Sequence, residues 1–412
     1  MRIEEVKARS LLSKRIKVDG WFHSNYSMNL YRGCQFACTY CDGMSEYYHV
    51  DNFQTHIRVK VNAPEVLRRE LKKLGYKNPT SLLDFTDSRI EYKKPIIGIS
   101  GGVSDSYQQA EKEYELTRNV LEVILDHELP IFLLTKSDLI LRDIDILKEI
   151  NEKAFASVCF SITQMDEPKK QQYEPASSST EERFQALKTL REAGIKGGVM
   201  AMPMLPYICD SIENMQKLVE EAKRAKTEFV LFGSLTLKPG RQKRHFLDTV
   251  RRYDPEKLDK IKNVYSNENR YGQPDRNKVP RNVMKLGYAI CRKVGVNPRS
   301  VRHQCQREYK SNHRVLQILL DLQYWMSMFL GRPRNEWKDI HTLAVNIEKG
   351  IQDLQNALKQ GKLESIIGSK LLSAVSQILQ TGSCDLQSQI IERVDRLSNR
   401  EYEKFISELS LP

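Results

Sequence analysis

The stretch Asn29-Leu-Tyr-Arg-Gly-Cys-Gln-Phe-Ala-Cys-Thr-Tyr-Cys-Asp42 carries three cysteines in the spacing Cys-x3-Cys-x2-Cys, with no fourth cysteine nearby. A cuboidal 4Fe–4S cluster normally takes four thiolate ligands. Three ligands, from Cys34, Cys38 and Cys41, would leave one iron with a vacant position, as a catalytic metal site does. The spacing therefore predicts an iron–sulfur cluster that keeps one iron open to a further ligand.

Two other uses of these cysteines fit the pattern less well. A disulfide framework needs an even set of cysteines in an oxidising compartment. A structural zinc site needs four ligands, usually as two separated pairs. Gly33 and Ala37, which precede the first two cysteines, allow the tight backbone turns that a cluster loop requires.

Downstream of this loop, apolar strands alternate with amphipathic helical patterns as in a parallel sheet. Strands are expected at 95–100, 131–135, 155–163, 198–204 and 228–235. The intervening patterns predict helices at about 107–127, through 147 and 150, at 180–193 closed by Gly194, and at 211–225. The fold class expected is α/β, as a partial (β/α)6 TIM-type barrel, whose active site would lie at the carboxyl ends of the strands.

The alternation stops after residue 245, which divides the chain into three expected parts. Residues 1–245 form the barrel core, with the cluster loop at 29–44. Residues 246–312 are basic and contain four prolines, so a loop-rich connecting segment is expected. Residues 313–412 have helical periodicity and predict a mainly α-helical C-terminal extension.

The charge of the chain is concentrated in one segment. The 412 residues carry a formal charge of +12, and residues 238–314 hold 21 Lys or Arg against 7 Asp or Glu. Five tyrosines are interleaved with this charge: Tyr253, Tyr265, Tyr271, Tyr288 and Tyr309. Such a segment favours nucleic acid, because cations neutralise phosphates and aromatic rings stack on bases. A solvated basic surface that binds nothing charged is the alternative.

Composition also bears on the compartment. No apolar run reaches membrane-spanning length, and no secretory signal follows Met1. Thiolate ligands and an oxygen-sensitive cluster belong in a reducing environment, so a cytoplasmic location without a membrane partner is expected.

At this point the chain resembles the radical S-adenosylmethionine (SAM) superfamily, and within it the spore photoproduct lyase-like, DNA repair photolyase-type group. The likeness covers roughly residues 20 to 240. It rests on the cluster loop and on further motifs in order: Ser100-Gly-Gly-Val-Ser-Asp105, Leu134-Thr-Lys-Ser137, Phe160-Ser-Ile-Thr163, Glu174-Pro175 and Thr236-Leu-Lys-Pro-Gly240. The resemblance implies a 4Fe–4S cluster and S-adenosylmethionine as cofactors. It also implies reductive cleavage to a 5′-deoxyadenosyl radical, with an electron donor such as flavodoxin or ferredoxin as a partner.

The resemblance assigns cofactor contacts to residues at strand ends. Gly101 and Gly102 would present backbone carbonyls to the ammonium of S-adenosylmethionine, and glycine permits that close approach. Ser104 and Asp105 are able to accept from the same ammonium, although Asp105 is also suited to cap the helix that follows.

Three further cofactor contacts are implied in the same way. Lys136 has the charge and reach to pair with the methionyl carboxylate, although a lysine at the surface would have no such role. Ser161 matches a family serine that touches the cofactor, with an ordinary hydrogen-bonded strand hydroxyl as the alternative. Tyr40, inside the cluster loop, occupies the aromatic position that usually lies against the adenine.

One departure from the lyase pattern concerns the hydrogen-atom donor. Spore photoproduct lyases have a cysteine just ahead of the Ser-Asp pair, where this chain has Val103. Cys209, after the fifth predicted strand, is a candidate donor, while Cys159 is better suited to the core. No further Cys-x2-Cys pair is present for an auxiliary cluster.

Three functional hypotheses follow. The first is a radical SAM enzyme, lyase- or repair-like, that acts on a nucleic acid. The second replaces the nucleic acid with a peptide or a small molecule. The third is an iron–sulfur redox sensor that binds DNA, and the strand-end cofactor residues argue against it because a sensor needs no cofactor pocket.

Overall fold

The computed structural model describes residues 1–15, 20–76, 93–267, 269–306, 308–350 and 352–409. It divides the chain into two compact units, each assembled from separate stretches of sequence. Unit 1 comprises Met1–Lys14, Tyr26–Asn78 and Ile97–Val301, and unit 2 comprises Arg15–Asn25, Pro79–Ile96 and Arg302–Pro412. This division differs from the expected boundaries at 245 and 312, because residues 246–301 belong to the same unit as the barrel.

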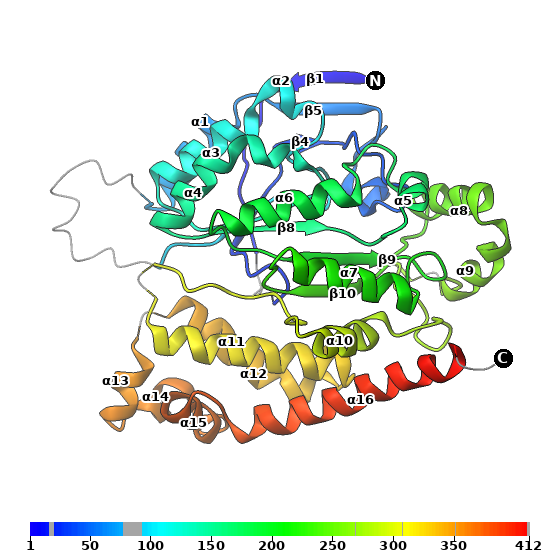
Figure 1. The fold of residues 1–412 in the computed structure, drawn as a ribbon. Coiled ribbons are helices and arrows are strands. Elements are labelled where there is room, and N and C mark those ends of the chain that lie inside the picture. Colours follow the sequence, from blue (N-terminus) through cyan, green and yellow to red (C-terminus); the bar gives the residue numbers. More distant parts are fainter. Residues whose placement is uncertain (16–19, 77–92, 268, 307, 351, 410–412) are drawn as a thin grey trace. The chain divides into compact units, whose positions relative to one another are not determined.

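Six parallel strands form the main sheet of unit 1 (Figure 1). They are β3 (Tyr26–Met28), β6 (Ile97–Ile99), β7 (Ile131–Thr135), β8 (Ala156–Ser161), β9 (Val199–Met204) and β10 (Val230–Ser234). They pair in chain order, and β2 (Ser13–Lys14) adds an antiparallel strand beside β3. Among the described residues β10 and β2 are the two edges, so the sheet is open and the predicted partial barrel is confirmed.

The helices between these strands bury one apolar stripe each. They are α3 (Leu116–Asp126), α4 (Ile144–Lys153), α6 (Thr180–Glu192) and α7 (Ile212–Arg224). In α6, a capping box fixes the start: the Ser179 hydroxyl accepts from the Glu182 N–H at 3.1 Å, and the Glu182 carboxylate accepts from the Ser179 N–H at 2.7 Å. Gly194, with a φ of +82°, follows the helix end as the sequence predicts.

The helix expected at 107–127 is interrupted. The structure has α2 (Glu111–Tyr114) and α3, separated by Glu115 with a φ of +45°. The buried Glu111 carboxylate accepts from the Thr117 N–H at 2.9 and 3.0 Å and so caps the start of α3. The Glu111 side chain therefore accepts from a backbone N–H that would bond to a backbone carbonyl in the continuous helix predicted at 107–127.

The expected loop-rich segment, residues 246–312, contains helices as well as loops. It contains the end of α8 (Arg241–Tyr253), the 3-10 turn η5 (Pro255–Lys257), α9 (Leu258–Val264) and α10 (Val283–Val294). Pro255 stands in the first turn of η5, a position where proline is tolerated because its missing N–H has no helical partner. Residues 268 and 307 of this segment lie outside the described residues.

A second, small sheet of unit 1 holds the cluster loop. It has the order β1 (Arg2–Val6), β5 (His56–Lys60), β4 (Tyr31–Arg32), and α1 (Ala63–Lys73) follows it. The chain from β4 to β5 contains the three cysteines, the 3-10 turns η1 (Asp42–Met44) and η2 (Glu46–Tyr48), and no other regular element among its described residues. The cluster loop thus starts directly after the first strands, at the carboxyl edge of the barrel.

Unit 2 is helical, which confirms the predicted C-terminal helical region. It contains α11 (Lys310–Tyr324), the π-helical turn η6 (Trp325–Phe329), α12 (Arg334–Lys349), α13 (Leu354–Lys359), α14 (Leu363–Ile367), α15 (Leu372–Thr381) and α16 (Asp385–Leu409). Residues 351 and 410–412 of the expected extension are outside the described part of the chain. Among the helices described, none is long and apolar enough to cross a membrane.

In unit 2, four buried or half-buried charged side chains from three distant stretches of sequence form one cluster of ion pairs. Arg302 pairs with Glu308 at 3.0 Å and with Glu348 at 3.1 Å. Lys93 pairs with the same two carboxylates at 3.0 Å each. The Asn25 amide donates to Glu348 at 2.8 Å. Two cations and two anions balance here, as burial of charge requires.

Candidate active site

Close backbone packing shapes the cluster loop. Gly33 has a φ of +87°, and a Cβ there would lie 2.7 Å from the His56 carbonyl oxygen and 2.8 Å from that of Phe53. Ala37 also has a positive φ, of +53°. The Cys34 N–H donates to the Phe53 carbonyl at 2.9 Å, which closes the loop. The predicted tight turns before the first two cysteines are therefore present.

The three cysteine side chains fit the ligand set of a cluster. Cys34 and Cys38 are buried and Cys41 is half-buried, and all three are free thiols. Burial raises the pKa of Cys38 to about 12 and that of Cys41 to about 11, and Cys41 adds to the rise at Cys38 because like charges repel. Thiolates so placed need a cation beside them, which the irons of a cluster supply.

Backbone donors also favour the thiolate forms. The Phe36 N–H bonds to the Cys34 thiol and the Gly43 N–H to the Cys41 thiol, and both bonds lower the respective pKa values. Within the described residues, no three His, Cys, Asp or Glu side chains converge on one metal ion.

The Gly-Gly turn at the end of β6 lies beside the cluster loop. Gly101 and Gly102 are exposed, with φ values of +123° and +65°, and no atom outside their chain neighbours lies within 4 Å of an added Cβ. A Cβ on Gly43 would lie 2.6 Å from the Gly102 carbonyl oxygen and 2.3 Å from the Phe53 ring. The two loops therefore approach each other so closely that only glycine fits at position 43.

Gly43→Ala is expected to lower the iron content per chain, because the loop carrying Cys41 must move away from the Gly102 carbonyl. Iron analysis and thermal unfolding of oxygen-free protein check this. Gly194→Ala is the matched control, because it strains a positive φ with open space around it. It should lower the unfolding temperature and leave the iron content intact. Full iron loading of Gly43→Ala would contradict the inferred contact.

Asp105 ties the ends of β6 and β7 together. Its carboxylate accepts from the Tyr107 N–H at 2.9 Å, the Thr135 hydroxyl at 2.8 Å and the Lys136 N–H at 3.0 Å. The expected helix-cap role is wrong, because α2 begins only at Glu111. Ser104 is buried beside it and donates to the Asn29 side chain at 3.4 Å. Both side chains therefore stabilise the backbone next to the predicted cofactor site. Their contact with the ammonium of S-adenosylmethionine stays a prediction.

Three predicted site residues from separate motifs, Tyr40, Lys136 and Ser161, are in contact, and Lys136 is the one that bonds to both of the others. The Lys136 ammonium donates to the Tyr40 hydroxyl at 3.0 Å and to the Ser161 hydroxyl at 2.9 Å. It also pairs with Glu174 at 2.9 Å. Tyr40 lies between two cluster cysteines in sequence, Lys136 follows β7 and Ser161 ends β8. The carboxyl ends of parallel strands thus bring these side chains to one edge, as the barrel predicts.

The anion of this network is Glu174, which has a place in the sequence-based prediction only within the motif Glu174-Pro175, and its second partner is Arg183, which has none. Arg183 donates to Glu174 at 2.6 Å, and both side chains are almost completely buried. Burial alone would raise the pKa of Glu174, but Arg183 and Lys136 hold it well below its usual range. The available signal was Arg183 itself, a cation on the apolar face of α6 in line with the buried Leu187 and Leu190.

Cys209 lies in the loop after β9, close to this network. Its thiol is 1% exposed and accepts from the Leu205 N–H at 3.0 Å. It lines a small cavity together with Tyr40, Tyr173 and Glu174. Burial raises the pKa of the Cys209 thiol well above its usual range, so it stays protonated. Cys159 and Cys291 are instead buried in β8 and α10.

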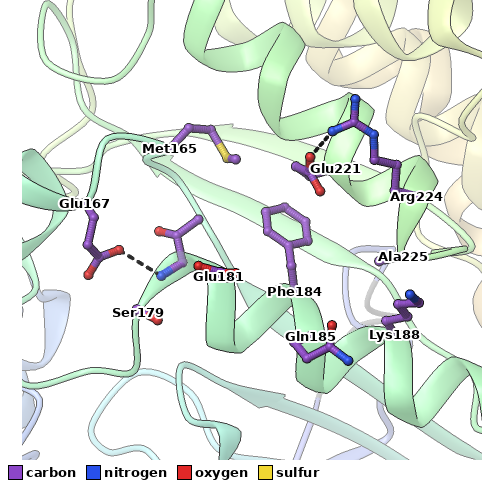
Figure 2. Close-up of a pocket in the computed structure, with 11 residues that line it drawn as sticks. Met165, Glu167, Ser179, Glu181, Phe184, Gln185, Lys188, Glu221, Arg224 and Ala225 are labelled. Atoms are coloured by element: carbon purple, nitrogen blue, oxygen red, sulfur yellow. Dashed lines mark hydrogen bonds and ion pairs between the residues drawn. The ribbon is translucent and has the colours of Figure 1, made fainter.

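A larger cavity, of about 530 Å³, lies on the outer helices and away from these residues (Figure 2). It runs along α6 and α7, between Met165, Phe184 and Arg224. None of the predicted site residues lines it. The cavity is therefore separate from the site at the strand ends.

Comparison with known proteins agrees with this site. A family model described as the radical SAM superfamily matches residues 28–221. An uncharacterized protein of Methanocaldococcus jannaschii is 32% identical over 250 residues, which cover 60% of this chain and 83% of that protein. The chain belongs to the radical SAM superfamily. Radical SAM proteins bind a 4Fe–4S cluster and S-adenosylmethionine, so these are its cofactors.

Other similar proteins are more distant. An uncharacterized protein of Mycobacterium tuberculosis is 27% identical over 245 residues, 58% of this chain and 67% of that protein. Among solved structures, spore photoproduct lyase in complex with dinucleoside spore photoproduct has a TM-score of 0.48 and 19% identity over 71% of this chain and 78% of that chain. A variant of that lyase with bound S-adenosylmethionine and the same dinucleoside has a TM-score of 0.44 over 60% and 66%.

Proposed function

We propose that this radical SAM enzyme acts on a nucleic acid in a lyase- or repair-like reaction. When bound, the cluster supplies the electron that cleaves S-adenosylmethionine to a 5′-deoxyadenosyl radical. A one-electron protein donor, such as flavodoxin or ferredoxin, is the proposed source of that electron. The family match supports the cleavage chemistry and sets aside the sensor hypothesis, and the surface beside the strand ends supports the substrate class.

The residues around Lys136 have a proposed role in holding S-adenosylmethionine. The ammonium of Lys136 has three partners, and the hydroxyls of Tyr40 and Ser161 are the two that a methionyl carboxylate would displace. Glu174 would remain, because Arg183 holds its other oxygen. The ion pair between Lys136 and Glu174, at 2.9 Å, holds the ammonium beside the cluster loop. Gly101 and Gly102 would then contact the ammonium of the same cofactor.

Cys209 is the proposed hydrogen-atom donor. This chain has Val103 at the position where spore photoproduct lyases have the donor cysteine. Hydrogen-atom donation requires the S–H form, which burial of Cys209 favours. The cavity that it shares with Tyr40 and Glu174 brings it to the strand-end side of the barrel.

The observation that carries the substrate class is a set of three aromatic–cation pairs at this side of unit 1, here called the tyrosine surface. Its pairs are Arg252 over Tyr253 at 6.0 Å, Lys260 over Tyr207 at 5.9 Å and Arg270 over Tyr271 at 4.7 Å. Tyr253 and Tyr271 are 41% and 56% exposed. Aromatic faces beside cations are the usual means of binding single-stranded nucleic acid.

Three residues of the tyrosine surface, Arg252, Tyr253 and Lys260, belong to α8 and α9. Figure 1 shows α8 and α9 beyond the ends of β8 and β9, next to α5 (Glu167–Tyr173). Asp254, which follows α8, pairs with Lys169 of α5 at 3.0 Å and accepts from the Tyr173 hydroxyl at 2.7 Å. These bonds hold the end of α8 against α5, the helix that follows β8.

Not every cation of the basic segment is available to phosphate. Arg302 is buried in the charge cluster of unit 2, Lys238 pairs with Asp42, and Arg281 pairs with Asp210 at 3.4 Å. The charge count of residues 238–314 therefore overstates the number of cations that could bind phosphate. The proposal depends on Arg252, Lys260 and Arg270, which lie beside tyrosine rings.

Tyr253→Ala and Tyr271→Ala are each expected to weaken binding of single-stranded DNA or RNA by about 1–3 kcal/mol, because each removes a ring on which a base stacks. Arg252→Ala and Arg270→Ala should each reduce the slope of log K against log salt by about 0.7. Fluorescence anisotropy with mixed-sequence oligonucleotides at several salt concentrations measures both effects. Lys217→Ala, on the exposed face of α7, is the control.

A flat salt dependence, or equal effects of the control and the test variants, would contradict the nucleic-acid proposal. Stimulation of 5′-deoxyadenosine formation by a peptide or a small molecule, and not by nucleic acid, would favour the second hypothesis.

A further inference from the structure

The motif Thr236-Leu-Lys-Pro-Gly240 follows the last barrel strand, and the mechanism proposed above gives it no role. In the structure this motif and the first residues of α8 lie against the cluster loop. Residues 238–242, here called the clasp, contact residues on both sides of Cys41. Cys41 is the most exposed of the three cluster cysteines.

The first contact of the clasp is an ion pair. The Lys238 ammonium donates to the two Asp42 carboxylate oxygens at 2.6 and 2.7 Å. Tyr48 donates to the same carboxylate at 2.6 Å, and its ring centroid lies 4.8 Å from the ammonium. Lys238 is 16% exposed, so solvent screens this pair only in part. Asp42 follows Cys41 directly, which places a compensated charge beside a cluster ligand.

The second contact holds the backbone of the loop. Gln242 is completely buried, and its amide donates to the carbonyls of Tyr40 and Thr236 at 2.9 Å each. Its side-chain oxygen accepts from the Lys238 N–H at 2.8 Å. One side chain therefore satisfies three buried backbone groups and links the residue before Cys41 to the residues after β10.

The third contact joins the start of α8 to η2. The Arg241 N–H donates to Glu46 at 2.8 Å, which places an anion at the amino end of a helix. Gly240, with a φ of +101°, leaves room for this carboxylate, because a Cβ there would lie 2.5 Å from it. Residues 40, 42 and 46 are thus all held from the same short segment.

We propose that the clasp is a positioning device for the cluster, in which Lys238 neutralises the charge of Asp42 beside Cys41, so that neither charge alone shifts the reduction potential, and Gln242 holds Cys41 in place. Charge and hydrogen bonding near the ligands tune the potential of an iron–sulfur cluster. An intact pair adds little net charge, whereas either partner alone leaves a unit charge close to Cys41. The inference depends on the cluster and not on the identity of the substrate.

The test is a charge cycle on the reconstituted, oxygen-free protein. Lys238→Met leaves Asp42 uncompensated and should shift the midpoint potential to a more negative value, because a nearby anion disfavours electron addition. Asp42→Asn leaves the cation and should shift it to a more positive value. The double variant should return close to the wild-type value. Potentials are read from the spectrum of the reduced cluster during titration with dithionite.

Lys262→Met is the matched control, because it removes the same charge from an exposed pair with Asp259 on α9. Its potential should equal that of the wild type. Shifts of the same sign in both single variants, or no shift in either, would overturn the electrostatic role. Since the readout is a potential, the result is independent of catalytic turnover.

Gln242→Met tests the positioning role. It removes the donors to the Tyr40 and Thr236 carbonyls while roughly conserving volume. Loss of iron to a chelator should be several times faster than in the wild type, with Lys262→Met again as the control. An unchanged rate in a variant that folds, judged by circular dichroism, would overturn this half of the proposal.

Discussion

Cys38→Ala is expected to abolish both cluster assembly and reductive cleavage of S-adenosylmethionine. The wild-type chain, reconstituted without oxygen, should contain about four iron and four sulfide ions. The variant leaves two thiols for an assembly that needs three, so iron should fall to background and 5′-deoxyadenosine should not form after dithionite reduction. The same result is expected for Cys34→Ala and Cys41→Ala.

Cys291→Ala is the control for this prediction, because Cys291 is completely buried in α10 and faces the Val230 carbonyl of β10. It should keep its full complement of iron. If Cys38→Ala retained a four-iron cluster, the assignment of the three ligands would be wrong.

Arg183→Met is expected to destabilise unit 1 by about 3–5 kcal/mol, the usual cost of leaving a buried charge without its main partner. Glu174 is 3% exposed and would keep Lys136 alone as a countercharge. Urea unfolding of the oxygen-free protein measures the loss. Arg224→Met, which removes an exposed arginine of α7, should cost less than about 1 kcal/mol. Equal effects would contradict the importance of the buried pair.

The acid dependence of this contribution has a definite sign. The pKa of Glu174 is depressed in the folded protein relative to its ordinary value of 4.5, so the unfolded state binds the proton more readily. The stabilisation is therefore fully present above pH 4.5 and is lost as the pH falls further. The wild type should lose more stability than Arg183→Met over that acidic range, and parallel acid profiles would contradict this assignment.

The sequence predicts the barrel well because its strands are short, apolar and separated by amphipathic helices. The same regularity explains why Tyr40, Lys136 and Ser161 were expected at one edge, where the structure joins them. Glu174 and Arg183 were not predicted as a pair, because their contact depends on the path of the chain between α5 and α6. A single sequence shows the unusual position of Arg183 but not its partner.

The errors have physical causes of a similar kind. Prolines made residues 246–312 resemble a loop, whereas Pro255 starts a helical turn. Asp105 has the spacing of a helix cap, but its carboxylate bonds across to β7. The division into units was also missed, because Arg15–Asn25 and Pro79–Ile96 precede most of the barrel in sequence and yet belong with the last helices.

The charge cluster of unit 2 has a consequence for synthesis of the chain on the ribosome. Asn25 and Lys93 emerge early, but their partners Glu308 and Glu348 are translated more than 200 residues later. Trp21 is also synthesised long before Tyr324, and the two ring centroids lie 5.5 Å apart in the folded protein. Most of the barrel can therefore form before these particular partners have been synthesised, and a nascent chain that stops after Val301 would lack them and be more open to chaperones and proteases.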